Sequence, residues 1–301
     1  MKTLRIGVVE KNQNPYWDRI NAGWQHAASA LNMNLNIRAP KHENIDEQRS
    51  LIREQLSSGV DALAFVASDP NGFDDLVSEA LKAEIPTITF DLDAPNSGRS
   101  YFIGMESPCD AGHRAGKEMV KHIPRGSNVI VQTGSAVAQG AIGKRKGFLE
   151  IMAEHEISVI ETAIDNEDNN QAYESLKEAL SATPDVAGLF GGYGYHAGIQ
   201  AKVAQELHVS PVIIGYDLLP DTIAGIENGA ITMSFWIQEY CFGLFGGAML
   251  SDACRLGLDT ALKIRGMDTI HLAQNANVPK PVAVTTDNIT DIRNRLKAMT
   301  F

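Results

Sequence analysis

The sequence predicts an α/β protein made of two doubly wound parallel-sheet lobes, and three observations carry this prediction. Short apolar runs rich in branched residues alternate along the chain with segments that carry an apolar stripe at helical spacing. Such alternation is typical of parallel sheets covered on both faces by right-handed crossovers. The 301 residues would supply about ten strands, and two sheets of about five fit usual domain sizes better than one sheet of ten.

The expected strands are the short apolar runs, near residues 4–9, 34–38, 62–66, 86–90, 100–104, 127–133, 157–163, 186–190, 211–215 and 231–236. The expected helices carry the apolar stripe, near residues 15–31, 46–58, 71–83, 107–122, 140–154, 169–181, 195–206, 219–228 and 239–257. One alternating series stops and the next begins near residues 101–108, so we place the joint between lobes there.

The tail predicts further crossings between the lobes. Residues 275–289 read as an extended segment with two prolines, which suits a crossing. Ile292 and Leu296 are the apolar positions of a final amphipathic helix. We therefore expect two similar lobes joined by several crossings, with the last helices exchanged between them.

The stretch after the first strand sets two large aromatic residues side by side. Asn14 is a natural N-cap and Pro15 a natural first helical residue, so a helix is expected to start here. Trp17 begins the apolar stripe of that helix, which continues through Ile20, Trp24, Ala27, Ala28 and Leu31. Tyr16 and Trp17 could face either the core or a ligand.

Composition excludes several classes of protein. With 44% hydrophobic and 21% charged residues the chain is an ordinary globular protein, and its apolar runs are too short to cross a bilayer. A net charge of -11 without a basic stripe disfavours nucleic acid as a partner. Three cysteines at no metal-like spacing imply neither a disulfide framework nor a metal site, and Cys241 and Cys254 fall on one helix, too far apart to bridge.

Catalytic signatures are missing from the sequence. It contains no HExxH, GxxxxGK or GxSxG motif. The glycines of GGYGYHAG at residues 191–198 do not match the dinucleotide fingerprint, and they suit a strand that turns closely into a helix. We therefore predict no enzyme activity, no catalytic residues, no metal and no cofactor.

Polar and aromatic residues follow the expected strands, where ligands bind in open α/β sheets. In each case a turn, capping or core role is the alternative. The residues that share this placement are Asn14, Tyr16, Trp17, Asp91, Glu167, Tyr193 and Asp217. Seven such residues at corresponding strand ends favour one shared cleft.

The chain resembles the type I periplasmic binding proteins, in the ribose-binding branch that also includes the ligand domains of lac-repressor-type regulators. The resemblance covers essentially the whole chain. It rests on segments that occur in the family's order: NPYWDRINAGWQHAASAL, SGVDALAFVASDP, IPTITFD, GKRKGF, TPDVAGLFGGYG, VIIGYDLLPDTIAGIENGAITMSFWIQ and VAVTTDNI. It implies two lobes joined by a three-crossing hinge that close over a sugar. The lobes would comprise residues 1–104 plus 237–278 and residues 105–236 plus 279–301.

Carried over by position, the resemblance divides the ligand residues between the lobes. Asn14, Tyr16, Trp17 and Asp91 would come from the first lobe, and Glu10, which ends the first strand, would lie in the same cleft. Glu167, Tyr193 and Asp217 would come from the second lobe, with Gln238 near a crossing. The chain departs from the family at Leu92 and Ile142, where relatives carry arginine.

The resemblance implies a solute-binding protein that captures a sugar or polyol by hinge closure and delivers it to the membrane permease of an ABC transporter. We expect a periplasmic monomer in processed form, since the sequence enters a strand almost at once; the alternative is a cytoplasmic protein. The alternative function is the ligand-sensing domain of a lac-repressor-type regulator or of a sensor-kinase pathway, and a third is an enzyme on the same scaffold.

Overall fold

The computed structural model describes residues 2–104, 106–183, 185–264 and 280–299. The chain divides into two compact units. The first unit comprises Met1–Met105, Gln238–Lys280 and Ala298–Phe301, and the second comprises Glu106–Ile237 and Pro281–Lys297. The predicted fold class, α/β with two parallel-sheet lobes, is confirmed.

The first unit is built on a five-stranded sheet in the order β2-β1-β3-β4-β5, and all neighbouring strands are parallel. Its strands are β1 (Leu4–Val9), β2 (Met33–Arg38), β3 (Ala62–Phe65), β4 (Thr87–Phe90) and β5 (Tyr101–Ile103). Strands β3, β4 and β5 are buried along their whole length, because helices cover both faces of the sheet.

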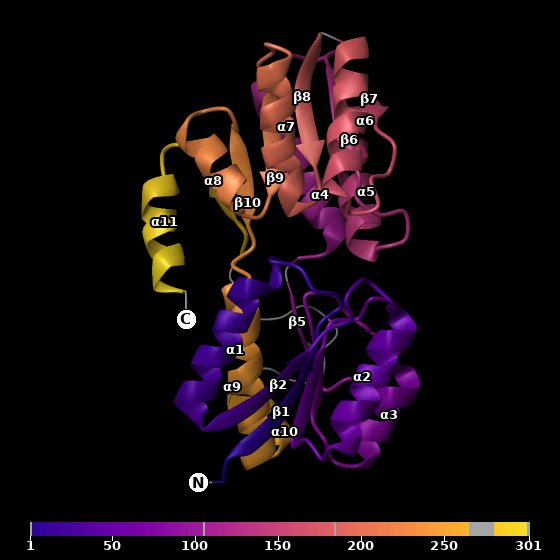
Figure 1. Ribbon diagram of the computed structural model, residues 1–301, viewed down its shortest axis with the longest axis vertical. Helices are drawn as coiled ribbons and strands as arrows, with labels where there is room; N and C mark the ends of the chain where they lie inside the picture. Colours follow the sequence, from indigo (N-terminus) through magenta and orange to yellow (C-terminus); the bar gives the residue numbers. More distant parts are fainter. Residues whose placement is uncertain (1, 105, 184, 265–279, 300–301) are drawn as a thin grey trace. The chain divides into compact units, whose positions relative to one another are not determined.

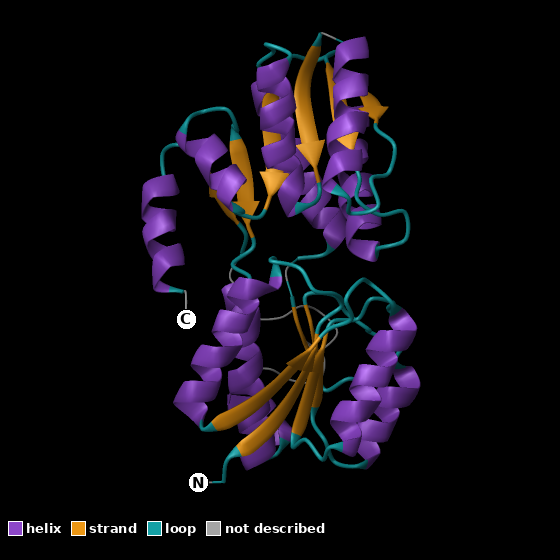
Figure 2. Ribbon diagram, viewed as in Figure 1, coloured by secondary structure: helices purple, strands orange, loops and turns teal. Residues whose placement is uncertain are grey.

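Helices lie on the two faces of this sheet in pairs (Figures 1 and 2). On one face α1 (Trp17–Leu31) packs against α9 (Tyr240–Leu256), and α10 (Leu258–Ile264) follows α9. On the other face lie α2 (Ile45–Ser57) and α3 (Asp74–Lys82). Under that second pair, Phe65 of β3 and Phe73 are fully buried with their ring centroids 5.1 Å apart.

The second unit repeats this topology and adds one strand. Its sheet has the order β11-β10-β9-β8-β6-β7. The strands are β6 (Asn128–Gln132), β7 (Ser158–Glu161), β8 (Val186–Gly191), β9 (Val212–Tyr216), β10 (Met233–Trp236) and β11 (Val282–Val284). All neighbours are parallel except β11, which pairs antiparallel with β10 at the edge of the sheet.

The helices of the second unit also pair. They are α4 (Pro108–His122), α5 (Gln139–Glu154), α6 (Asn169–Ala182), α7 (Gly194–Glu206), α8 (Pro220–Glu227) and α11 (Ile289–Ala298). Helix α4 packs against α5, and α6 packs against α7, which also contacts α8 (Figure 1). The final amphipathic helix is confirmed as α11, with Ile292 and Leu296 buried.

One local expectation is wrong, and one further helix was not expected. Asn14 is not the N-cap of α1, because residues 14–16 form a turn in which the Asn14 side chain accepts the Tyr16 N–H at 2.9 Å; the helix begins at Trp17. The extended segment expected at 275–289 falls partly on residues outside those described, and its described part contains β11, which starts directly after Pro281 at a sheet edge. Helix α10 was not expected.

Cys241 and Cys254 both lie on α9, as predicted, and both are free cysteines.

Candidate functional site

The candidate site residues lie at the carboxyl ends of parallel strands in both sheets. In each sheet the first strand along the chain has neighbours on both sides, with β1 between β2 and β3 and β6 between β7 and β8. This is the topological switch point, where the loops after adjacent strands diverge and leave a crevice.

Asp91 follows β4 at the carboxyl edge of the first unit. Its backbone has a left-handed φ of 62°, and its N–H donates to the carbonyl of Ile103 at 2.9 Å. The Tyr16 hydroxyl donates to Asp91 Oδ1 at 2.7 Å, so the structure brings together two residues that are 75 positions apart in sequence. Asp91 thus accepts one hydroxyl hydrogen bond already and is placed as an acceptor.

Trp17 lies behind Tyr16 in the core of the first unit. Its side chain is 2% exposed, and its indole N–H donates to Asn12 Oδ1 at 3.0 Å. The ring meets Tyr16 edge-on at 4.9 Å between centroids and Phe90 at 6.3 Å. This packing gives Trp17 the core role, and it leaves half-buried Tyr16 as the more accessible aromatic residue of the pair.

Glu10 follows β1 and is buried, with 5% of its surface exposed. Burial raises the pKa of Glu10 to about 7, against the lowering effect of a hydrogen bond from Asn21. Its Oε1 atom has no hydrogen-bond partner among the described residues. Glu10 therefore carries a proton over part of the neutral pH range, and in that form it can donate as well as accept.

Gln238 begins the return of the chain to the first unit. Its backbone φ is 58°, and its side-chain amide donates to the carbonyl of Lys280 at 2.9 Å. The neighbouring Glu239 is 3% exposed and accepts from Arg19 at 2.6 Å. The side-chain amides of Asn14 and Gln238 thus each form a hydrogen bond with a backbone group. The side chains of Tyr16 and Asp91 instead form a hydrogen bond with each other.

Asp217 follows β9 in the second unit, at the position that corresponds to Asp91. Its φ is 65°, and its N–H donates to the carbonyl of Phe235 at 2.9 Å. The carbonyl of Asp217 accepts from the Ser234 hydroxyl at 2.7 Å. A Cβ added to Gly194, at the start of α7, would lie 3.1 Å from the Asp217 carboxylate, so the acid lies directly against this turn.

Glu167 and Tyr193 both lie next to Gly134 in the second unit. The Glu167 N–H donates to the carbonyl of Gly134 and to Asp165 Oδ1, both at 3.1 Å. A Cβ added to Gly134 would lie 2.8 Å from the Tyr193 ring. The structure therefore gathers Glu167, Tyr193 and Asp217 around two glycines, Gly134 and Gly194.

A buried network that sequence reasoning missed supports this group. Asp165 accepts from the Tyr195 hydroxyl at 2.6 Å and from His196 Nε2 at 2.9 Å, and the Tyr193 N–H donates to His196 Nδ1 at 3.3 Å. Complete burial lowers the pKa of His196, although Asp165 opposes this, and burial raises the pKa of Tyr195. His196 is therefore a neutral imidazole that ties Tyr193 to Asp165.

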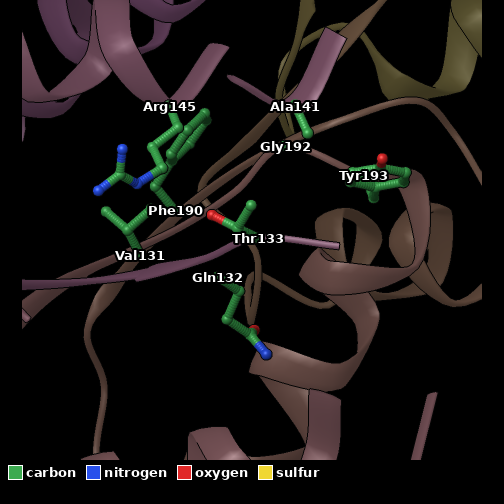
Figure 3. A pocket seen from close by; sticks show the side chains of 8 residues that line it. All are labelled: Val131, Gln132, Thr133, Ala141, Arg145, Phe190, Gly192 and Tyr193. Atoms are coloured by element: carbon green, nitrogen blue, oxygen red, sulfur yellow. The ribbon is translucent and has the colours of Figure 1, made fainter. Parts of the chain in front are cut away.

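A hollow lies at the switch point of the second sheet (Figure 3). Its lining comes from the ends of β6 and β8 and from the first turns of α5: Val131, Gln132, Thr133, Ala141, Arg145, Phe190, Gly192 and Tyr193. Figure 3 shows Tyr193 and Arg145 on opposite sides. The Gln132 amide donates to the carbonyl of Ala172 at 2.8 Å, so it belongs to the fold beneath the hollow.

The cations near the two edges have partners within their own unit. Lys144 Nζ donates to the carbonyl of Gly192 at 3.1 Å and lies 4.4 Å from the centre of the Tyr216 ring. The Arg145 guanidinium pairs with both oxygens of Glu161. Arg99 pairs with both oxygens of Asp93. Ile142, at one of the two positions where the family resemblance implies arginine, is 38% exposed.

Residues missed by sequence reasoning at this site include Asn12, Asp165 and His196. Asp165 and Asn12 follow strands and could have been found by the same criterion as Asp91. His196 lies inside a helix, where the sequence alone gives no signal that distinguishes it from other polar helix residues.

Two doubly wound sheets, each with an acid at the end of its fourth strand and polar loops at its switch point, define a two-lobed binding protein. The chain belongs to the family described as periplasmic binding protein domain, whose model matches residues 6–255. The family places the chain among binding proteins of the periplasmic type.

Relatives of known name are similar over most of the chain. The xylose/arabinose-binding protein XylF of Sulfolobus acidocaldarius is 27% identical over 251 residues, which are 76% of this chain and 61% of XylF. The ribose import binding protein RbsB of Salmonella typhimurium is 24% identical over 225 residues, or 74% of this chain and 75% of RbsB. The chain thus matches less than two thirds of the length of XylF.

A solved structure supports the fold. An ABC transporter solute-binding protein from Burkholderia graminis, in complex with D-arabinose, superposes with a TM-score of 0.83 at 24% identity. The match covers 96% of this chain and 97% of that protein. None of the helices within the described residues is long and apolar enough to cross a membrane.

Proposed function

We propose that the protein binds a neutral sugar or polyol and hands it to an ABC transporter. The observation that carries this proposal is the pair of acids, Asp91 and Asp217, at equivalent strand ends in the two sheets. The names of the relatives XylF and RbsB, which bind or import pentoses, support the ligand class.

The chemistry of the residues suits a polyhydroxylated ligand. A carboxylate accepts two hydroxyl hydrogen bonds at once, and charge-assisted bonds of this kind are the strong ones. Asp91, Asp217 and Glu167 are the acceptors, with Glu10 as a further candidate. Tyr16 and Tyr193 supply ring surfaces. The C–H groups on one face of a sugar can pack against such a ring through weak contacts. Asn14, Trp17 and Gln238 then support the loops that carry these groups.

We propose further that the ligand contacts residues of both units and shifts the population toward a closed state, because its contacts are complete only there. Delivery to a membrane permease in the periplasm belongs to this proposal and rests on the family and on the name of RbsB. Saturating ligand should then lower the radius of gyration in small-angle scattering, and an unchanged radius would argue against closure.

The decisive experiment identifies the ligand directly. Protein purified under native conditions is denatured, and the released small molecules are analysed by mass spectrometry. Candidates are then tested by calorimetry on unliganded protein, with D-ribose, D-xylose, L-arabinose, D-glucose and myo-inositol as a first set. Affinity in the micromolar range or tighter for one of them supports the proposal. Binding that is equal in wild type and in Asp91→Asn/Asp217→Asn would place the ligand elsewhere.

A further inference from the structure

Three side chains able to bind metals converge between α4 and α5 of the second unit, apart from the strand ends described above. Cys109 and His113 lie on α4, and Glu150 lies on α5. Their ligand atoms all lie within 4.8 Å of one another. His113 Nε2 is 2.6 Å from Glu150 Oε2, and Cys109 Sγ is 3.9 Å from the same oxygen.

Helix geometry fixes this convergence. Cys109 and His113 are separated by four residues, so they lie on one face of α4, one above the other. Glycines bring α4 and α5 into backbone contact beside them: a Cβ at Gly147 would overlap the carbonyl oxygen of Cys109, and a Cβ at Gly112 would overlap that of Lys144. Glu150 follows Gly147 by three residues, about one helical turn, and so faces His113 across this contact.

We propose that Cys109, His113 and Glu150 form a binding site for a divalent transition metal of the zinc type. A thiolate, an imidazole and a carboxylate are the three ligand types that Zn²⁺ takes in proteins, at about 2.0–2.3 Å from the metal. The site offers three protein ligands and leaves a fourth tetrahedral position for water, as three-ligand zinc sites do.

Metal binding requires movement of the three side chains alone, and the protons on Cys109 and His113 must leave the atoms that bind the metal. The Cys109 thiol releases its proton to solvent as the sulfur binds the metal. If the Nε2–H of His113 donates to Glu150 before binding, that proton moves to Nδ1 through solvent, and Nε2 then binds the metal. One thiolate and one carboxylate balance the charge of a divalent ion, so the complex is neutral.

The groups around the cluster suit this arrangement. His113 Nδ1 faces Asp110 Oδ1 at 3.8 Å, and a carboxylate beside the second ring nitrogen orients metal-bound imidazoles. The Ser107 hydroxyl donates to the other oxygen of Asp110 at 2.7 Å. Lys146 lies 3.9 Å from Glu150 Oε1, the carboxylate oxygen that does not face His113. The His113 and Glu150 side chains are 29% and 44% exposed, so an ion can reach them from solvent.

The test is a titration of the metal-free full chain with Co²⁺, which replaces Zn²⁺ in tetrahedral sites and is coloured. One equivalent should produce a thiolate-to-cobalt charge-transfer band together with visible bands of tetrahedral cobalt, and added Zn²⁺ should remove both. Cys109→Ser should abolish the charge-transfer band. His113→Asn and Glu150→Gln should each weaken Zn²⁺ binding about 10-fold or more in calorimetry.

Matched controls keep the result specific. Cys254→Ser removes a half-buried thiol of the first unit, and His122→Asn removes an exposed imidazole from the same helix, α4. Both should bind Co²⁺ as wild type does. A band that persists in Cys109→Ser, or the same affinity in His113→Asn and His122→Asn, would overturn the proposed site. So would the absence of any stoichiometric cobalt spectrum in wild type, because His113 and Glu150 would then form only an ion pair.

Discussion

Asp91 and Asp217 have the same backbone conformation at the ends of corresponding strands in two different sheets. Their φ angles are 62° and 65°, and each N–H donates at 2.9 Å to the carbonyl of the strand that follows, at Ile103 and Phe235 respectively. A left-handed conformation is uncommon for residues other than glycine, and aspartate and asparagine tolerate it best. Two acids held alike in this way suggest a shared role for their carboxylates.

Asp217→Asn should weaken ligand binding while the protein stays folded. Asparagine tolerates the left-handed conformation, so the loop is retained and only the charge is lost. Hydrogen bonds to charged groups are worth about 1.5–3 kcal/mol, which corresponds to a loss of about 10- to 100-fold in affinity. Calorimetry with the ligand identified from the purified protein measures this loss, and Asp91→Asn should behave in the same way.

A matched control for these variants is Glu84→Gln. Glu84 also has a left-handed φ, of 56°, but it is exposed and precedes β4, at the opposite end of the strand from Asp91. Its variant should bind the ligand as wild type does. Equal affinities for Asp217→Asn and Glu84→Gln would show that Asp217 is only a turn residue.

Trp17→Ala should destabilise the first unit, because the ring is buried against Tyr16 and Phe90. Truncation of a buried aromatic residue costs about 3–5 kcal/mol in the free energy of unfolding, and Trp17→Phe should cost less because a ring remains. Urea unfolding measures both values. If Trp17→Phe binds ligand normally and ligand does not change the tryptophan emission of wild type, then Trp17 does not contact the ligand; weaker binding by Trp17→Phe at unchanged stability would contradict the core role.

Much of the fold could be predicted from the sequence, because the apolar runs and helical stripes are set by local spacing. Asp91 and Asp217 could be located for the same reason, since each directly follows such a run. The bond between Tyr16 and Asp91 could not, because it depends on how the loop after β1 folds over β4. The same holds for β11, a short strand whose pairing with β10 is fixed only by tertiary structure.

The supporting groups were harder to predict than the acids. His196 is a helix residue whose role comes from Asp165 and from the Tyr193 backbone, and a sequence pattern carries none of these contacts. The cluster of Cys109, His113 and Glu150 was missed because the spacing of the cysteines gave no metal motif. Its third member lies on another helix, and only the close contact of α4 with α5 brings it near.

Glu10 should make stability fall as the pH rises through the neutral range. Burial raises its pKa from 4.5 to about 7, so the folded protein holds a proton that the unfolded chain releases. This contribution is fully present below about pH 4.5 and is lost as the pH rises to about 7; the shift corresponds to roughly 3 kcal/mol at most. Glu10→Gln keeps a neutral group at every pH, so its stability relative to wild type should increase from pH 5 to pH 8.

Chemical denaturation at a series of pH values checks this prediction. Glu79→Gln is the matched control, because it removes a carboxyl group from the exposed face of α3 in the same unit. A difference between Glu10→Gln and wild type that does not change with pH would mean that Glu10 is ionised in the folded protein throughout this range.

Asp165→Asn should disturb the group around Tyr193. The Tyr195 hydroxyl and His196 Nε2 both donate to Asp165, so an amide NH₂ at this position sets a donor against a donor in a buried site. The expected loss in the free energy of unfolding is about 1–3 kcal/mol, with weaker ligand binding because Glu167 also loses an anchor. Tyr195→Phe removes one donor only and should cost less. Wild-type affinity in Asp165→Asn would mean that the network supports the fold alone.

The last prediction concerns the charge of the ligand, which should be neutral or positive. The two edges carry the acids Asp91, Glu167 and Asp217, and this chain has Leu92 and Ile142 at the two positions where the family resemblance implies arginine. The cations close to these edges already bond within their own unit: Lys144 to the carbonyl of Gly192, Arg145 to Glu161 and Arg99 to Asp93. An anionic ligand would therefore meet carboxylates, and burial of an uncompensated negative charge is costly.

A thermal-shift panel of aldoses, alditols, cyclitols, amino sugars, uronic acids and sugar phosphates tests the charge prediction. Ligand at 100 times its dissociation constant adds about 2.7 kcal/mol to the free energy of unfolding, so a true ligand should raise the melting temperature clearly. The largest shift should come from a neutral sugar, a polyol or an amino sugar. If a uronic acid or a phosphate gives the largest shift, the prediction is wrong. Loss of that shift in Lys144→Met would then identify Lys144 as the cation that binds the anionic ligand. Lys144 Nζ lies 4.4 Å from the centre of the Tyr216 ring, and Tyr216 directly precedes Asp217 in the chain.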